Sequence, residues 1–213
     1  MSQPPLRSFP LFPLDIVAVP SESVPLHIFE ERYKRMIERC LAAAEGSLER
    51  EFGIVWLAED ELKPVGCACA IEQLLERLDD GRLNVVVQGT RPFRLLERQD
   101  DLPYPAGVIE FLDDEPEDPD GEAAAAARSL YRELVLQATD RELGDDELAR
   151  LGSYAMAGTV EFDVADKQQL LELRVENARM RLLARLLKAA LERLELLERA
   201  QVRALSNGKV RLA

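Results

Sequence analysis

The chain has 213 residues, of which 47% are hydrophobic and 31% are charged, and its formal net charge is −13. A chain of this length and composition buries one good core or two small ones. It has no apolar run as long as a membrane span, and no basic segment followed by an apolar one at its N-terminus. Three cysteines, an odd number, argue against a disulfide framework. We therefore expect a globular protein in the cytoplasm, with neither a membrane span nor a leader.

The negative charge is unevenly distributed. Residues 1–173 contain 17 basic and 36 acidic residues, whereas residues 174–213 contain 10 basic and 4 acidic ones. The body of the protein is therefore expected to repel nucleic acid, and only its C-terminal part would not.

A strand and a helix are predicted at the start of the chain. The nearly continuous hydrophobic residues over 11–19 indicate a buried strand, which the prolines in and after it restrict to an edge or a bulge. From Glu30 onward, Tyr33, Ile37 and Leu41 recur at spacings of four, which is typical of a half-buried helix.

The next part of the chain is predicted to be rich in strands. Hydrophobic runs and alternating patterns predict strands over residues 52–57, 65–75, 83–88, 91–96 and 107–112. Asp80-Gly81 is a hairpin signal between two of them. Six or seven strands around one helix are enough for a small closed or nearly closed barrel.

Residues 113–122 mark the predicted domain boundary. This segment holds seven acidic residues, two prolines and a glycine, so we interpret it as a solvated linker. The predicted division is a β-rich subdomain over 1–118, an α-helical subdomain over 119–206 and a C-terminal tail over 207–213. The fold class is α+β.

Four helices are predicted beyond the linker. The first covers 122–139 with Asp120 as its N-cap, and the second runs from Asp145 or Asp146 to about Gly158. A short helix opens near Asp163 and continues through 168–173. A long one covers 176–205 and ends at Asn207-Gly208. Its wide leucine stripe favours packing within the protein's own bundle over a coiled coil, and residues 194–205 are a candidate surface for a partner or for homodimer formation.

The first helix and its preceding strand carry a family resemblance. LFPLDIVAVP followed by VPLHIFEERYKRMI resembles the opening of the N-terminal domain of Lon proteases. The matching positions are Leu11, Phe12, Pro13, Leu14, Pro25, Leu26, Ile28, Phe29, Glu30, Arg32 and Tyr33. One departure is the turn, where this chain has Val19, Pro20 and Ser21 in place of a turn that contains glycine in the family.

The resemblance extends over most of the chain. It continues through 52–55, 80–82 and 91–94, and the DKQLLE-like pattern over 166–172 resembles the helix that precedes the long closing helix of that domain. The resemblance implies a PUA-like β pseudo-barrel followed by a helical bundle. It also implies recognition of unfolded or tagged polypeptide segments on behalf of a protease, with a protease or a chaperone as a further partner.

The sequence contains no recognisable catalytic motif, so we expect neither an enzyme nor a cofactor. Gly208-Lys209 lacks the glycine five positions ahead that a phosphate loop requires, and no serine lies in a Gly-x-Ser-x-Gly context. A chain with one histidine cannot form most histidine-based triads. The ATPase module and the Ser-Lys protease module of full-length Lon proteases have no counterpart here.

A zinc site is the alternative for the cysteines. Cys67 and Cys69 share one strand face, and Cys40 and His27 would complete four ligands. The spacing does not fit a zinc knuckle and the neighbours are apolar, so we interpret the three thiols as core residues and expect no metal.

The candidate peptide-binding residues are Tyr104, Trp56, His27 and Tyr33. Tyr104 lies between two prolines in a loop, where we expect it to be exposed and able to contact a peptide. Trp56 shares a strand face with Phe52, which favours the core. His27 lies in an apolar segment and is expected to be packed or at a rim.

We interpret the chain as a non-enzymatic protein-binding or peptide-binding module. It should expose an apolar patch, which we expect in the groove between the barrel and the helices. An RNA-binding PUA-like protein is the first alternative, although the acidic body argues against it. An adaptor that docks on one specific folded partner is the second.

Overall fold

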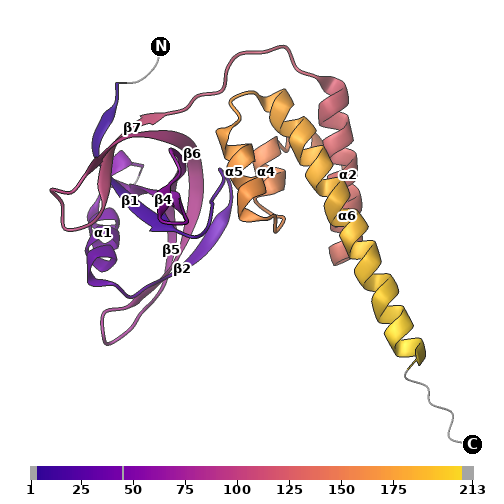
Figure 1. Cartoon of the computed structure of the whole chain (residues 1–213), viewed down its shortest axis with the longest axis horizontal. Coiled ribbons are helices and arrows are strands. Elements are labelled where there is room, and N and C mark those ends of the chain that lie inside the picture. Colours follow the sequence, from indigo (N-terminus) through magenta and orange to yellow (C-terminus); the bar gives the residue numbers. More distant parts are fainter. Residues whose placement is uncertain (1–3, 45, 208–213) are drawn as a thin grey trace, which may run out of the picture. The chain divides into compact units, whose positions relative to one another are not determined.

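The protein is described by a computed structural model that covers residues 4–44 and 46–207 (Figure 1). It forms two compact units. The β unit consists of Met1–Glu117 together with Gly152–Glu176, and the helical unit consists of Asp118–Leu151 together with Asn177–Ala213.

A single seven-stranded sheet forms the centre of the β unit. Its strands are β1 (Leu6–Leu14), β2 (Ser23–Ile28), β3 (Glu51–Ala58), β4 (Glu61–Leu62), β5 (Val65–Arg77), β6 (Leu83–Gln99) and β7 (Ala106–Phe111). The order is β1-β7-β6-β5-β3-β4, and a parallel pairing of β1 with β3 closes the ring. All other pairings are antiparallel, and β2 joins only β6. The sheet curls around its own core, and the predicted α+β class with a pseudo-barrel is confirmed (Figure 1).

The predicted strands over 83–88 and 91–96 are one strand, β6. Its first half pairs with β2 and β5, and its second half pairs with β5 and β7. Gly89 lies where the strand partners of β6 change. A Cβ at this position would come within 2.1 Å of the Val19 carbonyl oxygen. A glycine is therefore required at residue 89, inside a continuous strand, because another backbone segment approaches it closely.

The predicted strand over 11–19 ends early, at Leu14. Residues Val17 to Val19 are buried but form an irregular loop. The Val19 N–H donates to the Glu22 carboxylate at 3.0 Å, and the Gly89 N–H donates to the Glu22 carbonyl at 2.9 Å. A run of apolar residues indicates that a segment is buried but does not show that it is a strand. Around residues 17–19, hydrogen bonds with Glu22 take the place of strand pairing. Ser21 follows with φ of 69°, the left-handed conformation that glycine adopts at least cost.

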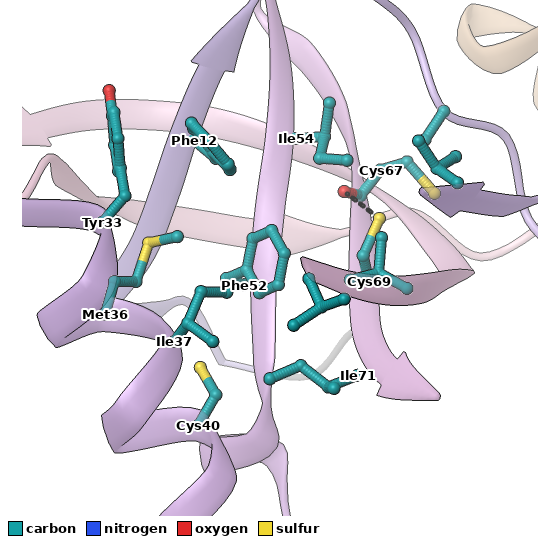
Figure 2. Packing of buried hydrophobic residues seen from close by; sticks show 14 of the residues in the cluster. Phe12, Tyr33, Met36, Ile37, Cys40, Phe52, Ile54, Cys67, Cys69 and Ile71 are labelled. Atoms are coloured by element: carbon teal, nitrogen blue, oxygen red, sulfur yellow. Dashed lines mark hydrogen bonds between the residues drawn. The ribbon is translucent and has the colours of Figure 1, made fainter. Parts of the chain in front are cut away.

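Helix α1 (Glu31–Ala42) closes one side of the pseudo-barrel, as predicted from its periodicity. It buries Tyr33, Met36, Ile37 and Cys40 against the strands, and Figure 2 shows these side chains next to Phe12 and Phe52. The rings of Phe12 and Tyr33 lie 4.1 Å apart. A short 3-10 helix, η1 (Leu48–Arg50), leads into β3.

Five helices follow the linker among the described residues: α2 (Gly121–Thr139), α3 (Asp145–Arg150), α4 (Ser153–Ala157), α5 (Val164–Glu172) and α6 (Glu176–Asn207). Asp120 caps α2 as predicted, because its carboxylate accepts the N–H groups of Glu122 and Ala123. The predicted helix over 145–158 is two short helices, α3 and α4, which are interrupted at Gly152. The end of the long helix was predicted at Asn207-Gly208, and Gly208 lies outside the described residues.

Helices α4 and α5 belong to the β unit. The buried side chain of Gln168 donates from Nε2 to the Val65 carbonyl at 3.1 Å, and Lys167 forms an ion pair with Glu22. The predicted division into subdomains over 1–118 and 119–206 stays a prediction, and the contacts group residues 152–176 with the sheet. No helix in the part of the chain that the structure describes is long and apolar enough to cross a membrane.

Candidate functional site

Two of the four candidate residues are buried. Tyr33 is 4% exposed, and burial raises the pKa of its hydroxyl. Tyr104 is 6% exposed, so the expectation that this loop presents an exposed ring is wrong. The Pro105 carbonyl accepts the Leu11 N–H at 2.8 Å, which holds the loop against β1, and the Tyr104 hydroxyl accepts a hydrogen bond from Arg39 Nη1 at 2.6 Å. These two hydrogen bonds hold the loop and the Tyr104 ring in their buried position.

The other two candidates lie on different parts of the sheet surface. Trp56 is half-buried against the core, as its strand face predicts, and the Lys63 ammonium lies 5.6 Å from its ring centroid. His27 is exposed on β2. The structure therefore does not bring the four residues together, and only His27 is fully accessible.

His27 belongs to a shallow groove on the ribbon that β2, β6 and the second half of β5 form. We call it the ribbon groove, and its lining residues are Pro25, Leu26, His27, Leu75, Glu76, Asn84 and Val85. The groove encloses about 580 Å³. Sheet register explains its polar row, because His27 lies opposite Asn84, and Asn84 lies opposite Glu76 on the other side.

Hydrogen bonds along this row orient the His27 ring. Asn84 Nδ2 donates to Glu76 Oε2 at 2.9 Å, so the amide oxygen of Asn84 faces His27 Nδ1 at 2.6 Å. Because that oxygen can only accept, Nδ1 must carry a proton. The row of side chains therefore has a single orientation, with His27 Nε2 on the side of the ring away from Asn84.

Large apolar side chains are exposed at this site. Phe29 is 62% exposed and its ring stacks on His27, with centroids 6.1 Å apart. Leu75 is 54% exposed in the wall of the groove. Exposed apolar groups that gather beside a groove are typical of an interaction surface.

Sequence reasoning did not single out Phe29 or Leu75 as binding residues. A signal existed for one of them: successive residues of a strand point to opposite faces, so the consecutive leucines Leu74 and Leu75 cannot both enter the core. Phe29 precedes the first helix and matches the family pattern, but nothing else in the sequence marks it as exposed.

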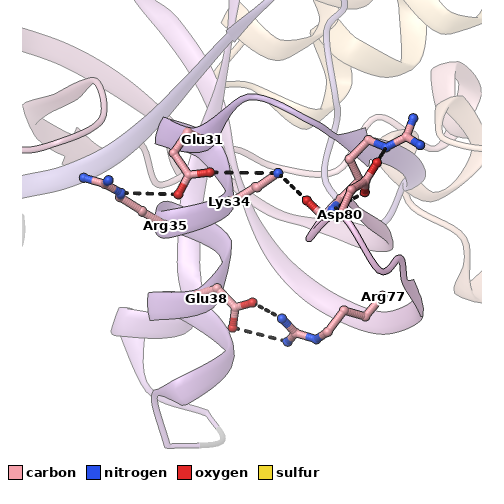
Figure 3. A network of polar contacts seen from close by, with 7 residues as sticks. Glu31, Lys34, Arg35, Glu38, Arg77 and Asp80 are labelled. Atoms are coloured by element: carbon pink, nitrogen blue, oxygen red, sulfur yellow. Dashed lines mark hydrogen bonds and ion pairs between the residues drawn. The ribbon is translucent and has the colours of Figure 1, made fainter.

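One ion pair and one hydrogen bond connect α1 to the hairpin that forms the groove (Figure 3). Arg77 donates from its two terminal nitrogens, Nη1 and Nη2, to the two oxygens of the Glu38 carboxylate, and these hydrogen bonds raise the pKa of Arg77. Lys34 donates to the Asp80 carbonyl at 3.1 Å. A hydrogen bond from the backbone N–H of Arg82 lowers the pKa of Asp80, and the Arg82 side chain lowers it further. These contacts are exposed and individually weak, but together they fix where the hairpin lies against the helix.

A second pocket lies between the β1–β2 loop and helices α4 and α5, near the predicted position of an apolar groove. It encloses about 400 Å³. Its lining residues are Ile16, Val17, Glu22, Val24, Gly158, Thr159, Val160, Glu161, Phe162, Val164 and Lys167. Its apolar residues are buried or half-buried, and its charged pair, Glu22 and Lys167, is satisfied internally. Of these two pockets, the ribbon groove is the one with large exposed apolar side chains, Leu75 in its wall and Phe29 beside it.

The three thiols are part of the core, and they are free. Burial raises the pKa of Cys40 to about 11 and that of Cys67 well above its usual range. A thiol that stays protonated is a poor nucleophile and metal ligand. Within residues 4–44 and 46–207, no group of three or more histidine, cysteine or acidic side chains is arranged to hold a metal ion.

The fold matches solved structures of Lon N-terminal domains. The crystal structure of a Lon N-terminal domain protein from Xanthomonas campestris superposes with a TM-score of 0.61 at 23% identity, over 82% of this chain and 95% of that one. The N-terminal domain of the Mycobacterium avium complex Lon protease gives 0.59 at 23% identity, over 85% and 98%. At this identity the likeness shows a shared fold.

Sequence comparison defines the family. Residues 8–189 match the family described as the ATP-dependent protease La (LON) substrate-binding domain, and the chain belongs to that family. It is 29% identical over 211 residues to the Lon protease of Xanthomonas oryzae pv. oryzae, covering 90% of this chain and 24% of the relative. It is 30% identical over 206 residues to the Lon protease of Anaeromyxobacter dehalogenans, covering 88% and 24%. The chain thus spans about a quarter of the length of these relatives, and the match contains no protease or ATPase domain.

Proposed function

We propose that this protein is a non-enzymatic binding module that recognises unfolded polypeptide segments through the ribbon groove. The observation that carries the proposal is the exposure of Phe29 and Leu75 beside a groove on a rigid ribbon. The family's description as a substrate-binding domain supports polypeptides as the ligand class. Two large apolar side chains that are already ordered offer area to a partner at low entropic cost.

Recognition is expected to use side chains and not the addition of a strand to the sheet. The outer edge of β2 has no strand partner among the described residues, but Pro25 lies in its middle. Proline in an edge strand has its nitrogen on the solvent side, so this edge lacks a donor for a continuous ladder. The second half of β5 is also an edge, and two register shifts, between Ile71 and Gln73 and between Leu74 and Glu76, interrupt it.

The ligand class is also supported against the alternatives. The acidic body opposes RNA, whose phosphates require clustered cations. A docking adaptor for one folded partner would use the same apolar groove, and the test below distinguishes it. The free, buried thiols suit a reducing compartment, so we place the protein in the cytoplasm.

The test is a fluorescence anisotropy titration of a labelled, permanently unfolded polypeptide with this protein. Micromolar, saturable binding that persists at high salt is the expected result, because apolar contacts dominate. The same titration with a folded protein should give no signal change. Binding of a folded partner alone would replace the proposal by the adaptor function.

A further inference from the structure

The polar groups around the ribbon groove carry a net negative charge. Glu72 and Glu76 are exposed on β5, and their hydrogen-bond donors are neutral: the Ser23 hydroxyl at 3.1 Å and the Asn84 amide. Neither glutamate forms an ion pair in the described part of the chain, unlike Glu38 or Asp80.

The basic side chains at the turn between β5 and β6 are already engaged, and so is Lys167 on α5. Arg77 is paired with Glu38, Arg82 with Asp80, and Lys167 with Glu22. His27 is linked to Glu76 only through Asn84. The carboxylate charges of Glu72 and Glu76 therefore have no cationic partner within the described part of the chain.

The two carboxylates bracket the apolar part of the groove. Ser23, Pro25 and His27 alternate along β2 and so share one face. Glu72 is bonded to the first of these residues, and Glu76 is linked through Asn84 to the last. Ser23 and His27 lie four residues apart on β2, which pairs without a register shift, and four residues of a regular strand span about 13 Å; this sets the scale of the separation between the two glutamates.

We propose that the ribbon groove selects polypeptide segments in which an apolar or aromatic side chain is flanked on both sides by lysine or arginine, with the two cations about four residues apart. The apolar side chain lies on Phe29, Pro25 and Leu75. Each cation pairs with one glutamate. This inference rests on the proposed function, and it adds charge and spacing to a recognition that apolar contacts alone would leave unselective.

The test uses three labelled peptides with the same apolar centre in a glycine-serine background. The first has one lysine two positions before the centre and one two positions after it, the second has glutamates there, and the third has both lysines at one end. Each exposed ion pair is worth a factor of roughly 1.5 to 5. We expect the first peptide to bind about tenfold more tightly than the second and about threefold more tightly than the third. The preference should shrink as salt rises toward about 0.5 M.

Matched variants locate the effect. The double substitution Glu72→Gln with Glu76→Gln keeps the shape and the acceptor oxygens, and it should abolish the preference for the lysine peptide. Glu97→Gln, an exposed glutamate at the far end of β6, removes one charge elsewhere and should preserve the preference. Equal affinity of wild-type protein for the lysine and glutamate peptides would overturn the charge selection while leaving polypeptide binding intact. Absence of binding by all three peptides and by a long unfolded polypeptide would overturn both proposals.

Discussion

Replacing Phe29 by serine should weaken polypeptide binding about thirtyfold. A phenylalanine side chain buries about 150–250 Å² when it is fully covered. Because Phe29 is 62% exposed, about 120 Å² is available to a partner. At about 25 cal/mol per Å², covering this area contributes about 3 kcal/mol. Ordering of the contacting side chains costs about 1 kcal/mol, which leaves about 2 kcal/mol, or about thirtyfold in Kd.

The assay for this prediction is anisotropy with an unfolded polypeptide, and it needs a control for lost exposed apolar area. Leu96 is 49% exposed at the other end of β6, and Leu96→Ser should change Kd less than about twofold. Both variants replace exposed residues, so their thermal unfolding midpoints should stay within about 2 °C of wild type. If Phe29→Ser binds as tightly as Leu96→Ser, the ribbon groove is not the binding surface.

Three further predictions concern the scaffold. Because burial raises the pKa of Cys40 to about 11, the unfolded chain loses this thiol proton at a lower pH than the folded protein. The contribution of Cys40 to the free energy of unfolding is therefore full below about pH 8 and falls as the pH rises. In urea unfolding between about pH 8 and about pH 10.5, Cys40→Ala should lose about 2 kcal/mol less stability than wild type. Lys167→Met leaves the Glu22 carboxylate, which is 14% exposed, without its cation. The free energy of unfolding measured by chemical denaturation should fall by about 1–3 kcal/mol, and a second substitution, Glu22→Gln, should restore part of this loss. The Ala123 N–H and Arg181 lower the pKa of Asp120, so the stabilisation of α2 by this carboxylate is present at neutral pH and is lost as the pH falls through the lowered pKa. In an acid titration followed by circular dichroism, the helical signal of Asp120→Asn should therefore change less with pH than that of wild type.

Periodicity predicted the elements that are amphipathic over their whole length. α1 and α2 were placed correctly because one side of each helix packs and the other is solvated, and Asp120 marks an N-terminus by its own hydrogen bonds. The family resemblance predicted the pseudo-barrel. By contrast, the continuity of β6 through Gly89 depends on the approach of another backbone segment, which local sequence does not encode.

The candidate site was less predictable than the fold, because exposure depends on tertiary contacts. Residues remote in sequence contact both buried tyrosines. Arg39 binds the Tyr104 hydroxyl and β1 binds the Tyr104 loop, whereas Phe12 packs on the Tyr33 ring. His27 was found in the sequence, but its row with Asn84 and Glu76 depends on strand register. Register is set by bulges that the sequence does not announce.

Hydrogen exchange of backbone amides, with and without a saturating unfolded polypeptide, tests the central claim most directly. The account predicts slower exchange in β2, in the second half of β5 and in the first half of β6, with Phe29 included and the far end of β6 unchanged. Protection confined to the pocket between the β1–β2 loop and helices α4 and α5, with no change in β2 or β5, would contradict it.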